Sequence, residues 1–440
     1  MRRPRRNQLF LVPKLVDHPH AKELATMSRL LGSIPDLDRL VMADLVQERR
    51  VDVGAPGMSG AQVLRVGLLK QLRGFTYEEL AFHLLDSASY QAFCGFGWGE
   101  HVPRRATLQQ NLARVRAATW EQINRLLVTH AVDEGIETCR RLRSDSTDVD
   151  ANILEPTDSG LLWDVVRVLT RLLKEASRRV EGVRFSNHTL AAKRRLVRIT
   201  YARSKKVRKP LYREFIRIAE DTLGYASDAL LVLRAEPKFH ARLAHVIELG
   251  ERVVEQTRRR VLNGEKVPAT DKVVSIFEEH AAILRKGLRE VHYGHRICVT
   301  TGASALIVDC VIEDGARVDS STTVRNVERF IDITGKTPEQ AAFDGGYASK
   351  ANLAEVKALG IKDVAFNKKV GLKVPEMVRE TWMYRALWRY RVGVESVISL
   401  LKRCFGLRRC TWRGEARFSA YVWSSVVAYN VLFLARTQRE

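Results

Sequence analysis

The chain has 440 residues, of which 45% are hydrophobic, so two or three globular domains are expected rather than a single core or a disordered chain. Lysine and arginine outnumber aspartate and glutamate by 73 to 51, and the net charge of +22 favours a polyanion such as nucleic acid as the partner. Six cysteines without CxxC pairs argue against a secreted disulfide framework, fit reduced thiols in a cytoplasm, and indicate no cysteine-based metal site.

The first 135 residues are predicted to form a basic arm followed by a helical DNA-binding domain. The arm, MRRPRRNQLFLVPKL, lacks the long apolar run and the cleavage site of a secretory signal. Between residues 59 and 135, capping-box patterns that begin at Ser59, Thr76 and Thr119 predict three helix starts. The region is therefore expected to be all helical.

A Gly-rich turn, GFGWGEHVPRRAT, lies between these helices. A helix is expected over 107–118, with Thr107 as its cap and with Arg104 and Arg105 at its N-terminal end. A basic helix end of this kind suits a DNA backbone, and a purely structural helical bundle explains the same pattern equally well. Both interpretations stay open for this helix.

Strand and helix patterns alternate in much of the remaining chain. The segment RLRSDSTDV (141–149) is bounded like a strand, and residues 296–315 predict a β-hairpin with a glycine at its turn. After the hairpin the pattern gives a helix near 322–335, a strand in 339–346, a helix in 349–360, a strand in 363–367 and a helix that contains Glu395. This alternation predicts an α/β domain with a partly parallel sheet.

The segment from 155 to 290 is helical in pattern, with LLWDVVRVLTRLL as its clearest amphipathic run. Within it, residues 193–217 contain 11 basic residues against one acidic residue, Glu214. A solvated helix face usually mixes both signs, so this tract favours a phosphate-binding surface. The side chains assigned to that surface are Lys193, Arg194, Arg195, Lys205 and Lys206.

Residues 416–435 approach the length of a membrane span. Three serines and Asn430 interrupt their apolar run, and a basic segment precedes them. We therefore expect a buried core helix and no membrane partner.

Two aspartates occupy positions where chemistry is expected. Asp344 lies in AAFDGGYAS, at the end of an apolar strand, where open α/β sheets place their ligands, although an aspartate before glycine is also an ordinary turn residue. Asp145 lies inside a strand, where aspartate is disfavoured unless it is exposed or functional. Asp148 and Asp150 compete with it and are predicted to face the other side of the sheet.

Glu395 is the only acidic residue in RVGVESVISLLKR (391–403). On a helix it shares one stripe with Arg391 and Lys402, and taken alone this is an ordinary i,i+4 surface pair. Together with Asp145 and Asp344, however, it completes a set of three carboxylates that suits two divalent ions over a phosphodiester.

The stretches DSTDVDANILEPTDSGLLWD, FDGGYASKAN and RVGVESVISLLKRCFGL resemble the three acidic motifs of bacterial insertion-sequence DDE transposases, closest to ISNCY-type elements related to the IS-five superfamily. The likeness covers most of the chain. It implies that Asp145, Asp344 and Glu395 are the catalytic, metal-binding acids. It also implies two Mg²⁺ ions per site, replaceable by Mn²⁺.

The family signature around the catalytic glutamate implies DNA contacts from Arg391 and Lys402 on its stripe. Trp388 stands where the signature has tyrosine, and a tryptophan there can stack on a base or a sugar. With the basic tract, Arg104 and Arg105, these residues form the expected DNA-binding set. The partners would be double-stranded transposon ends and target DNA, with the protein acting as a homodimer in the bacterial cytoplasm at the nucleoid.

The implied fold class is an α/β RNase H-like catalytic core, a mixed sheet with helices, interrupted by a helical insertion and preceded by an all-helical N-terminal DNA-binding region. The expected domains are 1–135 for the arm and N-terminal domain, 136–154 with 291–440 for the core, and 155–290 for the insertion. The implied reaction is cleavage of a phosphodiester and joining of the 3′-OH to target DNA. An inactive or domesticated DNA-binding regulator, or a nuclease without strand transfer, would share the same charge and helices.

Overall fold

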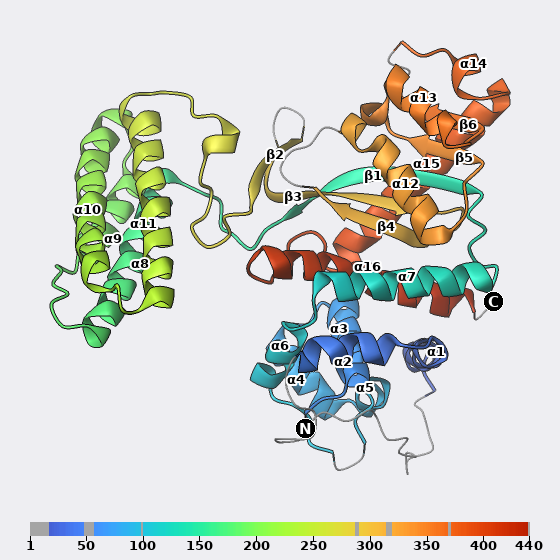
Figure 1. Cartoon of the computed structure of the whole chain (residues 1–440), viewed down its shortest axis with the longest axis horizontal. Coiled ribbons are helices and arrows are strands. Elements are labelled where there is room, and N and C mark those ends of the chain that lie inside the picture. Colours follow the sequence, from blue (N-terminus) through green and yellow to red (C-terminus); the bar gives the residue numbers. More distant parts are fainter. Residues whose placement is uncertain are drawn as a thin grey trace. The chain divides into compact units, whose positions relative to one another are not determined.

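The computed structural model describes residues 17–47, 57–97, 100–286, 290–313, 319–367 and 371–438 (Figure 1). The predicted basic arm lies outside these residues, as does the centre of the Gly-rich turn. The chain divides into two compact units, which are residues 1–150 with 295–440 and residues 151–294. The expected three-domain boundaries stay a prediction.

The N-terminal part of the first unit is helical throughout its described residues. Its helices are α1 (Pro19–Ser33), α2 (Leu37–Val46), α3 (Gly60–Arg73), α4 (Tyr77–Asp86), α5 (Ala88–Cys94), α6 (Arg105–Leu112) and α7 (Ala117–Asp133). Apolar side chains from all seven helices are buried in the main core of the unit.

Two of the three predicted capping boxes are confirmed. Ser59 Oγ accepts from the Gln62 N–H at 3.1 Å while Gln62 Oε1 accepts from the Ser59 N–H at 2.9 Å, and Thr76 and Glu79 repeat the arrangement at the start of α4. The third, at Thr119, is wrong. Helix α7 begins at Ala117, and Thr119 donates its hydroxyl at 2.6 Å to Asp44 of α2.

The start of α7 is set by Asp44. Its carboxylate accepts the backbone N–H of Arg116 at 2.7 Å and so caps the helix from a neighbouring element, which no local pattern reveals. The helix predicted over 107–118 is also displaced. Helix α6 starts at Arg105 with Arg104 as its N-cap, so Thr107 is inside the first turn, and the helix ends at Leu112.

A mixed sheet forms the centre of the first unit. Its strands lie in the order β4 (Ile307–Ile312), β3 (Glu290–Thr301), β1 (Arg141–Asp150), β5 (Gln340–Phe343) and β6 (Asp363–Phe366). β1, β5 and β6 are parallel, while β3 and β4 form the predicted antiparallel hairpin. The strands predicted at 141–149, 339–346 and 363–367 are confirmed.

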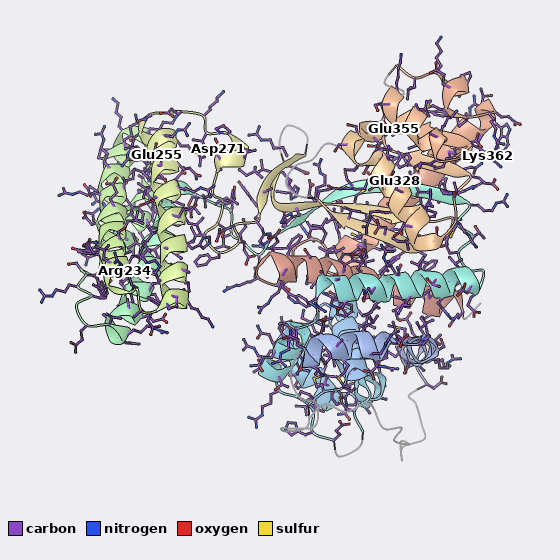
Figure 2. All side chains as sticks on the ribbon, viewed as in Figure 1. Arg234, Glu255, Asp271, Glu328, Glu355 and Lys362 are labelled. Carbon is purple, nitrogen blue, oxygen red and sulfur yellow. The ribbon has the colours of Figure 1, made fainter. Side chains whose placement is uncertain are left out.

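Helices cover this sheet. The predicted helices are confirmed as α12 (Thr323–Thr334), α13 (Lys350–Ala358) and α15 (Thr381–Cys404), and short α14 (Val374–Met377) precedes α15. Helix α15 packs on β1, β5 and β6. Figure 2 shows charged side chains such as Glu328 of α12 and Glu355 of α13 on the outer side of these helices.

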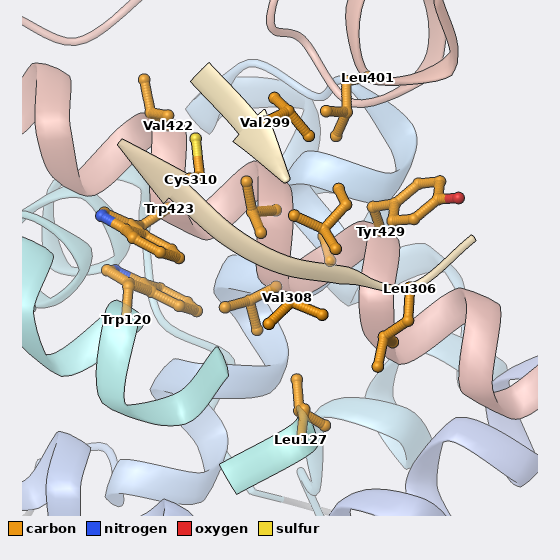
Figure 3. Close-up of a cluster of buried hydrophobic side chains, with 14 of the residues drawn as sticks. Trp120, Leu127, Val299, Leu306, Val308, Cys310, Leu401, Val422, Trp423 and Tyr429 are labelled. Carbon is orange, nitrogen blue, oxygen red and sulfur yellow. The ribbon is translucent and has the colours of Figure 1, made fainter. Parts of the chain in front are cut away.

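Helix α16 (Glu415–Thr437) joins the N-terminal helices to the sheet. It is long and apolar enough to span a membrane, but 83% of its most apolar window is buried inside the structure, as expected for a core helix. Figure 3 shows side chains of α7, β4 and α16 in one cluster, among them Trp120, Val308 and Trp423. Within this cluster Asn430 accepts from the Ile307 N–H at 2.9 Å and donates to Asn124 at 2.7 Å.

The second unit has its own hydrophobic core, formed by α8 (Asp158–Arg179), α9 (Thr189–Tyr201), α10 (Lys205–Val232) and α11 (Pro237–Thr257), which lie side by side in Figure 1. The prediction of helix up to residue 290 is wrong after residue 262. A π-helical turn (Arg258–Leu262) ends at Asn263 and Gly264, where a φ of +75° breaks the helix. The strand β2 (Ala282–Lys286) then pairs with the first residues of β3.

Candidate active site

The register of two parallel strands brings the first two acids together. Ser144 of β1 is paired with Phe343 of β5, so Asp145 and Asp344 are the next residues on adjacent strands. Asp344 directly follows β5 and precedes a short 3₁₀ turn that starts at Gly345. The predicted placement of Asp344 at a strand end is confirmed.

The third acid lies on α15, which packs against these same strands. Val394, Val397 and Leu401 face the core, and Glu395 lies half-exposed at the edge of this buried face. Arg391, one turn earlier, is only 7% exposed although it is charged. A buried arginine needs partners, and its partners define the site.

The guanidinium of Arg391 lies among all three acids. Its Nη1 is 3.7 Å from Asp145 Oδ2 and also 3.7 Å from Asp344 Oδ1, while its Nη2 is 2.6 Å from Glu395 Oε1. The Asp145 and Asp344 oxygens are therefore at most twice 3.7 Å apart. One cation thus offsets the mutual repulsion of three carboxylates.

The surroundings of Asp145 disfavour its charged form. Burial, together with the nearby carboxylates of Asp344 and Glu395, raises the pKa of Asp145 to about 6. The Ser146 N–H, which donates to Asp145 Oδ1 at 2.8 Å, and the Arg391 guanidinium oppose this rise. A carboxyl whose charge is disfavoured in this way gains from any further cation placed beside it.

Asn367 is a residue of the site that the sequence patterns did not single out. It directly follows β6, next to β5, and its Nδ2 donates to Asp344 Oδ1 at 3.1 Å. Its own Oδ1 accepts the indole N–H of Trp388. Trp388, the predicted DNA contact, therefore orients the amide that orients Asp344, and its ring is still 46% exposed.

A buried polar network lies beneath the two aspartates. Ser144, the neighbour of Asp145, has its Oγ 3.1 Å from Cys298 Sγ, which in turn is 3.2 Å from the hydroxyl of Tyr347, three residues after Asp344. Burial raises the pKa of Cys298 to about 12, so the thiol stays protonated and acts as a hydrogen-bonding group. All six cysteines of the chain are free thiols.

The competing aspartates are engaged elsewhere. Asp148 is three positions from Asp145, faces the other side of the sheet and pairs with Arg296 at 3.1 Å. The backbone of Asp150 bridges to residues after α15, where its carbonyl accepts the Cys410 N–H at 2.8 Å. Neither contact brings these acids toward Arg391.

The other predicted DNA-binding residues come from several elements of the two units. Lys402 is partly buried on α15, and Arg104 and Arg105 are exposed at the start of α6, where Arg105 is 3.5 Å from Glu78. In the second unit the basic tract spans α9 and the start of α10, where four of its five assigned side chains are exposed and Arg195 is paired with Glu214 at 2.5 Å.

Comparison with protein-family models gives two matches. Residues 285–431 match the transposase DDE domain, and residues 15–114 match a second transposase domain, DUF772. Together these matches support an insertion-sequence transposase. The DDE match contains Asp344 and Glu395, whereas Asp145 lies between the two matches. No curated protein and no solved structure matches the chain.

A DDE domain implies metal-dependent activity in general, and Mg²⁺ requires oxygen ligands. Among the described residues no three His, Cys, Asp or Glu side chains are already close enough to hold a metal ion. The donor set nevertheless fits, because all three groups are carboxylates that converge on one cationic nitrogen pair, and carboxylates are the protein ligands of Mg²⁺.

Replacing Arg391 by methionine should expose the repulsion among the three acids. We expect Arg391→Met to lower the free energy of unfolding by about 1–2 kcal/mol in EDTA, because two of its three partners are half-exposed and partly screened. Addition of Mn²⁺ should recover most of this loss. The measurement is thermal unfolding of the full chain with and without Mn²⁺.

The matched control is Arg389→Met, on the exposed face of the same helix. It removes the same charge without touching the acids and should be insensitive to Mn²⁺. An equal loss for both variants, or a loss at Arg391 that Mn²⁺ does not reduce, would contradict the prediction.

Proposed function

We propose that the protein is a DNA transposase that binds the ends of its element, cleaves a phosphodiester and joins the 3′-OH to target DNA. The observation that carries this proposal is the convergence of Asp145, Asp344 and Glu395 on the Arg391 guanidinium. Three acids brought from two strands and a helix to one point have no evident structural purpose, and they suit metal-assisted phosphoryl transfer.

In this proposal Asp145, Asp344 and Glu395 hold two Mg²⁺ ions, for which Mn²⁺ can substitute. Bound there, the ions would stabilise the attacking and leaving oxygens of an in-line displacement. Asn367 keeps one oxygen of Asp344 in place while the other is left for a ligand. Arg391 balances the carboxylates before ions and DNA arrive, and its buried position favours this over a direct phosphate contact.

We also propose that the solvent face of α15 and the basic tract contact the DNA. Trp388 is exposed and lies two helical turns before Glu395, on the same side of α15. The exposed side chains of Arg385 and Arg389 lie beside it. Arginines beside an exposed aromatic ring suit a DNA backbone and an adjacent base or sugar. Lys402, Arg104 and Arg105 would extend the contact, and the cell's nucleoid is the expected location.

Substitution of the acids tests the reaction. Asp145→Asn, Asp344→Asn and Glu395→Gln should each reduce metal-dependent cleavage by at least about 10³-fold, because each removes a ligand from a site that acts as a unit. Gel-shift affinity for a duplex from the DNA flanking the gene should stay unchanged. Cleavage and strand transfer are measured on the same preparations.

The control is Asp332→Asn, which removes a carboxylate paired with Arg125 on an exposed surface. It should cleave like the wild type. Full cleavage by Asp145→Asn would remove that residue from the site. Cleavage by the wild type without strand transfer would identify a nuclease, and binding without either reaction would identify a regulator.

Neutralising the exposed part of the basic tract tests its role. The variant carries Lys193→Gln, Arg194→Gln, Lys205→Gln and Lys206→Gln. We expect weaker binding to every sequence and a salt slope of log K that falls by about 0.9 for each lost phosphate contact. Arg195 is left in place because Glu214 already neutralises it.

A control variant removes the same number of charges from the same unit, at Arg178, Arg234, Lys238 and Arg252, which are also exposed. Arg234, at one end of the bundle in Figure 2, lies just after α10. Equal slopes for the two variants would mean that only net charge matters. An unchanged slope for the tract variant would leave the tract as a solvated helix face.

We propose that the active form is a homodimer. Two transposon ends must be cut and joined to one target, so two active sites have to be held in a fixed relation, and a twofold-symmetric dimer is the simplest closed arrangement. In such a dimer one subunit can bind the end that the other subunit cleaves.

Mixing two variants with different defects tests this division of labour. A Glu395→Gln subunit retains the basic tract, and the four-substitution tract variant retains the acids. We expect an equal mixture to recover about a quarter of the wild-type cleavage, since half of the dimers are mixed and each mixed dimer combines a functional tract with functional acids at one of its two sites. Lack of recovery, with mixed dimers confirmed by native mass spectrometry, would mean that each subunit cuts the end it binds.

A further inference from the structure

Arg143 is a second buried arginine near the acids. Among the described residues, no ion pair joins it to Asp145, Asp344 or Glu395. It lies two residues before Asp145 on β1, so both side chains leave the same face of the sheet, toward α15. It is 8% exposed. A buried guanidinium bound only to neutral groups is costly, so its position calls for an explanation.

All three nitrogens of this guanidinium are engaged. Nε donates to Thr301 Oγ1 at 2.8 Å, Nη1 donates to the backbone carbonyl of Tyr390 at 2.8 Å, and Nη2 donates to the carbonyl of Ser304 at 3.3 Å. The Tyr390 ring covers the guanidinium, with its centroid 4.4 Å from Cζ. Arg143 therefore connects β1, the loop after β3 and the backbone of α15.

Gly393 is shaped to this arginine. A Cβ atom at Gly393 would lie 2.1 Å from Arg143 Nη1 and 2.6 Å from Cζ, so any larger residue there would force the guanidinium or α15 to move. Glycine is unfavourable inside a helix, and Gly393 lies inside a helix of 24 residues. Its φ is not positive, so the backbone conformation does not require a glycine there. It lies midway between Arg391 and Glu395 in the sequence.

The loop on the other side of Arg143 is also fixed. The buried carboxylate of Glu137 accepts hydrogen bonds from two backbone N–H groups of this loop, Ala303 at 2.9 Å and Ser304 at 3.0 Å. The hydroxyl of Tyr390 donates to the carbonyl of Gly302 in the same loop. The guanidinium is thus held from the loop side as well as from the helix side.

We infer that Arg143 and Gly393 are positioning residues that set the distance between Asp145 and Glu395. The inference rests on the proposed function, because it treats these two acids as ligands of the same ions. Arg143 acts two residues from the first acid and Gly393 two residues from the third. A shift of α15 relative to β1 would separate the acids without unfolding either element, and its effect would appear in metal affinity.

A double-mutant cycle tests the contact. Gly393→Ala should weaken Mn²⁺ binding about tenfold, as is usual when a residue that orients metal ligands is disturbed. In an Arg143→Ala background, where the space is open, the same substitution should change the affinity less than about twofold. Mn²⁺ binding is measured on the full chain by the electron paramagnetic resonance signal of the free ion, and the Mg²⁺ concentration for half-maximal cleavage is measured in parallel.

Two further variants keep the test decisive. Gly224→Ala, at an exposed glycine inside α10 with nothing within 4 Å of the added Cβ, is the matched control and should bind Mn²⁺ like the wild type. Arg143→Lys keeps the charge but loses the planar guanidinium and its three hydrogen bonds, so it should weaken Mn²⁺ binding without a steric clash. This variant replaces Gly393→Ala in the test if Gly393→Ala does not fold. Thermal unfolding is recorded for every variant.

An equal effect of Gly393→Ala with and without Arg143 would overturn the inference, as would wild-type Mn²⁺ affinity in both Gly393→Ala and Arg143→Lys. The proposed function fails separately. In that case the wild type itself shows no metal-dependent cleavage and Glu395→Gln binds Mn²⁺ as the wild type does. Cleavage by the wild type combined with unperturbed Gly393 variants would remove only the positioning role.

Discussion

Electrostatic balance among three carboxylates and one guanidinium constrains the whole first unit. Asp145, Asp344 and Glu395 come from three elements, and like charges at this separation repel one another unless a cation lies among them. Arg391 supplies that cation from the same helix as Glu395. The strands must therefore be in register, and α15 must lie close enough to β1 and β5 for one side chain to reach both aspartates. Other contacts in the unit hold α15 against β1 and β5.

Different contacts fix each of the three elements. β1 and β5 are aligned by their parallel ladder, and the buried side chains of Ser144 and Cys298 tie β1 to the neighbouring hairpin. Asn367 ties Asp344 to α15 through Trp388. Arg143 ties β1 to the middle of α15. The acids are thus placed by backbone ladders and polar contacts that apolar packing alone would not specify.

The sequence predicted the parts of this arrangement that follow from local patterns. Alternation of apolar residues identified β1, β5, β6 and the hairpin, and the family resemblance pointed to the three acids that the structure brings together. It did not predict the depth of Arg391, because helical periodicity gives a direction and not a distance from the sheet. Asn367 and the pair of Arg143 with Gly393 depend on contacts between residues more than 20 and more than 240 positions apart. The Thr119 capping box failed for the same reason, since Asp44 caps α7 from another helix.

The long insertion raises the question of how β1 keeps its register when 139 residues separate it from β3. The two ends of the insertion are bonded to each other, since the Ala151 N–H donates to the Tyr293 carbonyl at 2.7 Å. At the same point the Asp150 backbone is bonded to the segment after α15. The strands that enter and leave the insertion are held side by side, so the insertion is a closed loop on the sheet. The entropic cost of closing such a loop rises only slowly with its length. The insertion itself is stabilised by the separate core of α8–α11.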